Sequence, residues 1–182
     1  MRCDNVRVGE LLSQIAAGNL GAFDELYSHT GKMIYAYILS ISGNTHFSED
    51  IKQDTYIKVI ENIKTYNPAK NSVAWLIQIA KNTTLNALKR QKSAPLLFSE
   101  SEEEVNVIST PSEAQRTEEE ALLEYMMKIL PTGSREIVVM HVYGGYSQTE
   151  IAALLKLPLT TVQWRYRAAM KKLRKYYEEE RT

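Results

Sequence analysis

The stretch YSQTEIAALLKLPLTTVQWRYRAAMKKLRK, Tyr146 to Lys175, consists of two amphipathic segments separated by a Leu-Pro-Leu turn. The second segment carries six basic residues and no acidic one between Thr160 and Tyr176. At helical spacing one face of this segment is apolar and should pack on the preceding helix; it holds Val162, Tyr166, Ala169 and Leu173. The stretch therefore predicts a helix, a short turn and a second helix with a basic outer face.

The outer face of the second segment has the groups that suit a DNA major groove. Hydroxyl, indole, amide and guanidinium side chains match the edges of bases and the phosphates on both rims. In a helix-turn-helix the second helix enters this groove. A solvated face remains an alternative, whereas a membrane-surface helix is disfavoured because no broad apolar stripe is left once the core stripe is buried. The candidate DNA-contacting residues are Thr160, Thr161, Gln163, Trp164, Arg165, Arg167, Lys171 and Lys172.

The composition is that of a globular protein. Among 182 residues, 44% are hydrophobic and 24% are charged. No apolar run approaches the roughly 18 residues of a membrane span, and the N-terminus lacks the apolar segment of a signal peptide, so we expect a cytoplasmic protein. The single cysteine, Cys3, excludes an internal disulfide framework.

The zero net charge is the total of three unlike parts. Residues 1–92 have 11 basic and 8 acidic residues, residues 93–120 have 1 and 8, and residues 121–182 have 10 and 6. Two basic ends joined by an acidic connector indicate two modules that approach polyanions.

The connector, Ser93–Glu120, contains two prolines, many serines and the acidic run Glu102-Glu103-Glu104, and these break every helical period. We interpret it as a flexible linker between a domain at 1–92 and a domain at 119–182, the linker itself being 93–118. Its apolar islands, Leu96–Phe98 and Val105–Ile108, either belong to a solvated tether or dock on a partner.

Apolar residues recur at helical spacing on both sides of the linker, and no useful stretch alternates with period two. The sequence thus predicts an all-α protein built as two helical bundles. Ser48 and Ser72 are expected to cap helices, and Ser147 with Glu150 forms a capping-box pattern. The expected helices are Val8–Ala17, Leu20–Ser42, Ser48–Tyr66, Ser72–Gln91, Glu118–Leu130, Ser134–Val142, Ser147–Leu155 and Thr160–Glu179.

The segment Tyr66–Lys92, YNPAKNSVAWLIQIAKNTTLNALKRQK, is a proline-containing loop followed by a helix. A polar face carrying Gln78, Asn82 and Lys89 suits the bases and phosphates of a single strand, and the loop could hold an extruded base. Trp75 lies at the edge of this face, although a core position is the favoured interpretation. The expected buried stripe is Leu76, Ile79, Ala80, Thr83 and Ala87.

These two motifs resemble those of extracytoplasmic-function sigma factors of the sigma-70 family. Tyr146–Leu173 resembles region 4, which in the family recognises the −35 promoter element. Trp75-Leu76 and Ile79-Ala80-Lys81-Asn82 match the pattern of region 2, and the resemblance covers about Phe23–Lys92 and Glu119–Lys175. It departs from the family at Lys156, where a glycine is usual, at Gln163-Trp164-Arg165, where Lys-Ser-Arg is usual, and at Ala168, where an arginine is common.

The resemblance implies a role for region 2 in opening the promoter. The loop Tyr66–Asn71 is implied to capture a flipped base of the −10 element, while Asn82 and its helix contact the non-template strand. The implied −10 residues are Tyr66, Lys70, Asn71, Gln78, Lys81, Asn82 and Lys89.

The segment SEDIKQDTYIKVIENIKTY has a mixed acidic, amide and apolar side formed by Asp50, Gln53, Asp54 and Ile57. Complementarity to the helix dipole explains acids in the first turn but does not reach Asp54. One apolar residue among polar ones suits a protein interface. In the family, the Asp-x-x-Gln motif, here Asp50–Gln53, docks on the β′ clamp helices of core RNA polymerase.

The resemblance further implies core RNA polymerase (β′ clamp helices and β flap) and promoter DNA as partners. It also implies an anti-sigma factor, in this family often a membrane protein; the chain would be a monomer when free or 1:1 with its partner. Two other interpretations stay open, a stand-alone helix-turn-helix regulator and a helical adaptor that binds no DNA.

Catalysis finds no support in the sequence. There is no glycine-rich phosphate loop and no nucleophile motif. His46 with Glu49, Asp50 and Asp54 could begin a metal site on one helix, but no second set like it on another helix completes it. We therefore predict no enzyme, no metal and no cofactor.

Overall fold

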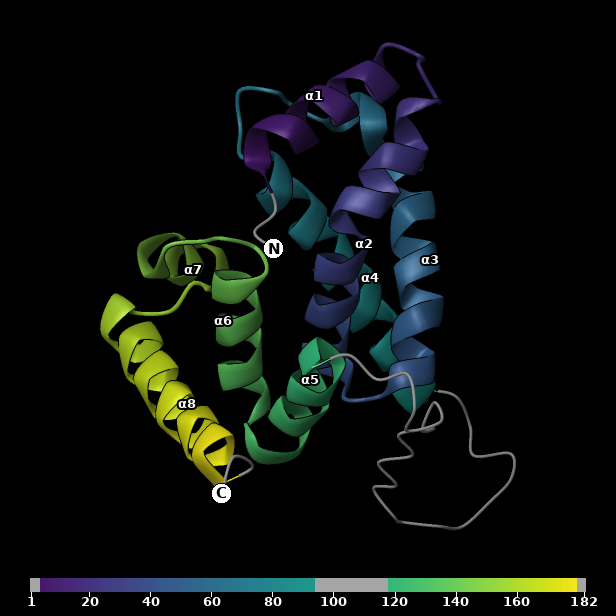
Figure 1. The fold of residues 1–182 in the computed structure, drawn as a ribbon. Coiled ribbons are helices and arrows are strands. Elements are labelled where there is room, and N and C mark those ends of the chain that lie inside the picture. Colours follow the sequence, from purple (N-terminus) through teal and green to yellow (C-terminus); the bar gives the residue numbers. More distant parts are fainter. Residues whose placement is uncertain (1–3, 94–117, 180–182) are drawn as a thin grey trace.

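The computed structural model describes residues 4–93 and 118–179, and within these ranges all regular structure is helical, so the all-α prediction is confirmed. The N-terminal module, on the right in Figure 1, contains α1 (Asn5–Ala16), α2 (Ala22–Ser42), α3 (Thr45–Asn62), the 3-10 turn η1 (Ile63–Thr65) and α4 (Ser72–Ser93). The C-terminal module contains α5 (Glu118–Ile129), α6 (Thr132–Val142), α7 (Gln148–Leu155) and α8 (Leu159–Glu179).

Helix α2 is the centre of the N-terminal module because α1, α3 and α4 all pack on it. Its buried side chains include Leu26, Ile34, Tyr37 and Ile38. In the C-terminal module α6 has the same role and contacts α5, α7 and α8. Burying these apolar faces is the main stabilising contribution in both modules.

The two modules pack on one another through α2 and α6, the contact seen near the middle of Figure 1. The Tyr37 hydroxyl donates a hydrogen bond of 2.7 Å to Glu136 Oε1 across this contact. Near the end of α2, the Arg135 guanidinium lies beside Gly43, so that a Cβ there would be 3.6 Å from Nη1. Sequence reasoning did not foresee this contact between the modules.

Two of the three predicted helix caps are wrong. Helix α3 begins three residues before Ser48, and the Asn44 side chain caps it by accepting from the Phe47 N–H at 2.9 Å. Ser48 is buried inside the helix and donates to the Asn44 carbonyl at 2.6 Å. At α4 the residue before Ser72 is the cap, since Asn71 Oδ1 accepts from the Ala74 N–H at 2.8 Å. The capping box of Ser147 and Glu150 at α7 is confirmed.

The buried stripe of α4 is rotated from the predicted one. Leu76 and Ala80 are buried as expected, whereas Ile79, Thr83 and Ala87 are only half-buried. The stripe shifts because α1, α2 and α3 all pack on this helix. The residues that complete it are Val73, Ile77 and Thr84.

The predictions for the acidic linker, its apolar islands and Cys3 lie outside the described residues. Among the helices that the structure does describe, none combines the length and the apolar character needed to cross a bilayer.

Candidate nucleic-acid interface

Helix α8 has an apolar face turned inward and a basic face turned to solvent. Val162, Ala169 and Leu173 are buried as predicted, while Tyr166 is half-buried against the His141 ring at a centroid distance of 4.8 Å. The inward face packs on α6 as well as on the preceding helix α7. The residues exposed on the other side include Thr160, Trp164, Arg167 and Lys171. The structure thus leaves the predicted groove-facing row open to solvent.

The remaining predicted residues of α8 lie to the sides of this row. Thr161 and Gln163 are half-exposed. Arg165 crosses the first turn of α6, where a Cβ on Gly133 would lie 2.6 Å from Nη1. Lys172 is exposed, and its ammonium donates to the Ile129 carbonyl at 3.4 Å. Arg165 and Lys172 therefore lean toward the junction of α5 and α6.

Helix α7 is fixed by local chemistry at both ends, with a capping box at its start and a left-handed residue where it meets the turn before α8. Ser147 Oγ accepts from the Glu150 N–H at 3.2 Å, and Glu150 Oε2 accepts from the Ser147 N–H at 2.8 Å. Lys156 ends α7 in the left-handed conformation, with φ 53°. Side chains with a Cβ are strained there, so this is the position at which a glycine would fit best.

The loop between η1 and α4 is braced by α1. The Tyr66 hydroxyl and Ser72 Oγ lie 2.8 Å apart, and the Tyr66 ring packs edge-on against Trp75 at 5.3 Å. A Cβ on Gly9 of α1 would lie 2.8 Å from Ser72 Oγ, so a larger residue there would force the Ser72 side chain to shift. Asn5 Oδ1 accepts from the Val73 N–H at 3.1 Å. These contacts position the loop that carries the exposed Lys70 and the half-buried Asn71.

The outer face of α4 bears a longer polar row than the sequence predicted. Gln78, Asn82 and Lys89 are exposed as expected, and Gln78 Nε2 donates to Asn82 Oδ1 at 2.9 Å. Asn86 and Arg90 are exposed on the same side and were missed. Their spacing of four residues from Asn82 onward is a signal that could have found them, because such residues share a helix face.

Lys81, another predicted −10 residue, is engaged at the contact between the modules. Its ammonium lies 3.5 Å from Glu136 Oε1, the oxygen that also accepts from Tyr37. Burial, followed by the negative charge of Glu136, raises the pKa of Tyr37 well above its usual range. Tyr37 and Glu136 were not predicted, because the two are 99 residues apart in the chain and no local pattern links them.

The predicted polymerase-binding residues share the exposed side of α3. Asp50, Gln53 and Asp54 are open to solvent, and the Ile57 side chain is 56% exposed. An apolar residue this open among polar ones is what a protein interface uses.

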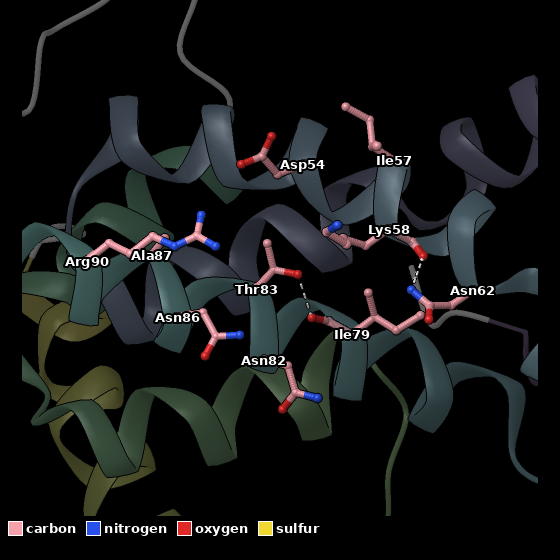
Figure 2. Close-up of a pocket in the computed structure, with 10 residues that line it drawn as sticks. All are labelled: Asp54, Ile57, Lys58, Asn62, Ile79, Asn82, Thr83, Asn86, Ala87 and Arg90. Carbon is pink, nitrogen blue, oxygen red and sulfur yellow. Dashed lines mark hydrogen bonds between the residues drawn. The ribbon is translucent and has the colours of Figure 1, made fainter.

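A groove of about 460 Å³ runs between α3 and α4 and joins two of the predicted surfaces (Figure 2). Asp54 and Ile57 line its α3 side, and Asn82 lines its α4 side. No local sequence pattern indicated that these residues border one groove. The full lining is Asp54, Ile57, Lys58, Asn62, Ile79, Asn82, Thr83, Asn86, Ala87 and Arg90.

Comparison with protein families assigns both modules. The model described as "Sigma-70 region 2" matches residues 26–94, and the model described as "Sigma-70, region 4" matches residues 120–173. The chain therefore belongs to the sigma-70 family, as a sigma factor of the extracytoplasmic-function group. Its function is to direct the initiation of transcription.

Curated relatives agree over nearly the whole chain. The "ECF RNA polymerase sigma factor SigK" of Mycobacterium tuberculosis (strain ATCC 25618 / H37Rv) is 25% identical over 174 residues, which cover 90% of each chain. The "RNA polymerase sigma factor CarQ" of Myxococcus xanthus is 25% identical over 162 residues, covering 89% of this chain and 92% of the relative.

Solved structures share the fold. The structure of CnrH in complex with the cytosolic domain of CnrY superposes with a TM-score of 0.62 at 24% identity, over 95% of this chain and 98% of the other. The sigma factor RpoE of Bartonella quintana, in complex with the anti-sigma factor NepR, superposes with a TM-score of 0.64 at 20% identity, over 86% of this chain and 96% of the other.

Proposed function

We propose that this sigma factor divides its work among three exposed surfaces. Asp50, Gln53, Asp54 and Ile57 on α3 bind core RNA polymerase. The outer face of α8 grips the −35 duplex, and the loop at 66–71 together with the outer face of α4 holds unpaired bases of the −10 element. The division of the chain into 1–92, an acidic linker 93–118 and 119–182 belongs to the same proposal.

The observation that carries the proposal is that these faces lie open to solvent on helices whose opposite sides form the core. A basic helix face that is exposed to solvent is available to phosphates, and neutralising several of them gives salt-sensitive affinity. That affinity fixes the position of the protein on the promoter.

Strand opening then follows from the balance of stacking energies. Each base-pair step opened costs about 1–2 kcal/mol of stacking. Each base captured on an aromatic or polar surface returns about 1–3 kcal/mol. A few captures at the loop and at α4 can therefore bias melting without a chemical fuel.

Lys81 contributes to this step only after it leaves Glu136. Its ammonium faces α6 in the free chain, so a DNA contact by Lys81 requires the two modules to move apart. Core polymerase would supply this separation by binding each module at a different place.

An anti-sigma factor is the proposed regulator. CnrH and RpoE are described in complexes with CnrY and NepR, and this chain shares their fold. A helical partner that holds the two modules together would keep the α3 and α8 faces from polymerase and promoter. The chain would be a monomer when free, would pair 1:1 with such a partner, and would act in the cytoplasm, where transcription takes place.

The direct test is transcription in vitro with purified core polymerase. A template library with a randomised promoter region should yield transcripts only when core and the chain are both present. The double variant Arg167→Ala/Lys171→Ala should lose most transcripts, while Met170→Ala, on the same helix, should keep them. Tight, specific duplex binding by the chain without polymerase would support a stand-alone regulator instead, and unchanged transcription in the double variant would support an adaptor.

A further inference from the structure

Trp164 is an unusual residue to leave open to water. Its side chain is 70% exposed on the second turn of α8. A buried indole contributes a large apolar area to a protein core, whereas this one leaves most of its area in contact with water. The structure thus leaves a broad apolar surface largely open to solvent.

The position of Trp164 puts this surface where α8 would meet DNA. It lies on the exposed side one turn after Thr160 and one turn before Arg167. Side chains on a helix lean toward its N-terminus, so the indole covers the turn of Thr160. In a helix-turn-helix the N-terminal part of the second helix is the part that reaches base edges.

We propose that Trp164 contacts the C5-methyl group of a thymine in the −35 duplex and so selects thymine at that position. This inference rests on the proposed function and specifies what one residue of the site recognises. In an intact duplex the base faces are stacked, so an indole can touch only edges. The thymine methyl is the one apolar group among the major-groove patterns of the four base pairs.

The exposed neighbours of Trp164 on α8 are charged and suit other groups of the DNA than a methyl. Arg167 and Lys171 are exposed one and two turns further along the same side, and their charges suit phosphates and acceptors. They would hold the helix in the groove, while the indole, with a single N–H donor, would match a methyl better than a polar edge.

The test starts from holoenzyme made with the full chain and purified core polymerase. It transcribes a duplex library randomised across the upstream promoter region, in which each template carries a transcribed barcode that identifies its promoter, and sequencing of the barcodes in the transcripts reports the preferred bases. We expect at least one strongly preferred thymine with the wild type, and loss of that preference with Trp164→Ala. Synthetic promoters with thymine or uracil at that position then isolate the methyl group.

Removing the methyl should weaken wild-type holoenzyme binding about fourfold, the value of one buried carbon group. Trp164→Ala should bind the thymine and uracil promoters equally. Trp164→Phe should keep part of the discrimination, and Met170→Ala, which removes another exposed apolar side chain from α8, should keep all of it. The thermal midpoint of Trp164→Ala should match the wild type, because the side chain lies outside the core.

Failure of the inference differs from failure of the proposed function. No transcript from any library member would contradict the proposed function. Transcripts with clear base preferences, combined with a Trp164→Ala holoenzyme that still distinguishes thymine from uracil, would overturn the inference alone. A wild-type holoenzyme that transcribes but shows no preferred thymine would overturn it as well.

Discussion

Replacing Glu136 with alanine should destabilise the free chain by weakening the contact between the modules. The buried Tyr37 hydroxyl would lose its 2.7 Å acceptor, and an unpaired buried hydroxyl costs about 1–3 kcal/mol. The pair with Lys81 is 3.5 Å long, with 28% and 15% of the two side chains exposed, so solvent screening keeps its contribution below about 1 kcal/mol. The expected loss is therefore about 1–4 kcal/mol.

The assay is urea unfolding of the full chain followed by circular dichroism. The matched control is Glu61→Ala, which breaks a pair with Lys58 at 2.6 Å in which each side chain is 52% exposed. An exposed pair of this kind is worth less than about 1 kcal/mol. If Glu136→Ala costs no more than Glu61→Ala, the α2–α6 contact does not exist in the free chain as described.

Three further predictions concern stability. The pKa of Tyr37 in the folded chain is raised above the unfolded value of about 10, so stability present below pH 10 should be lost above it, by up to about 1.4 kcal/mol per pH unit. Urea unfolding near pH 9 and pH 11 should show a smaller loss of stability for Tyr37→Phe than for the wild type. An equal loss would mean that Tyr37 is not the group responsible. Lys156→Gly should raise stability by up to about 1 kcal/mol because it relieves the left-handed strain at φ 53°; a lower thermal midpoint would show that the strain is absent. Ser147→Ala should cost about 1 kcal/mol through loss of the capping box, and an unchanged thermal midpoint would mean that the cap contributes nothing to α7.

The helices were predictable because they depend on local periodicity. The apolar spacing of Val162, Ala169 and Leu173 defined the inward face of α8, and the pattern of Ser147 and Glu150 defined the start of α7. Each signal is local, since Ser147 and Glu150 are one turn apart and Val162 and Leu173 about three turns apart on one helix. The structure retains them because the local preference and the tertiary packing agree.

The caps failed where two suitable residues compete. Asn44 and Ser48 are both good capping residues, and the sequence alone does not show at which of the two the helix begins. The same holds for Asn71 and Ser72. In each case the serine is drawn inward, and its hydroxyl bonds within the protein.

The contact between the modules and the bracing of the loop could not be predicted from spacing. Tyr37 and Glu136 meet because α2 packs on α6, and Asn5 meets Val73 because α1 crosses the start of α4. Such contacts depend on how helices assemble in three dimensions. The roles of the α3, α4 and α8 residues in polymerase and promoter binding remain predictions.

The most direct measurement of the central claim is the reactivity of unpaired thymines toward permanganate on a promoter selected from the library. The account predicts reactive −10 thymines only when core polymerase and this chain are present together. It also predicts that Asn82→Ala reduces their reactivity while the −35 contact persists. Equal reactivity with core polymerase alone, or no reactivity with the holoenzyme on a template that it transcribes, would contradict the claim that α4 and its loop hold the melted strand.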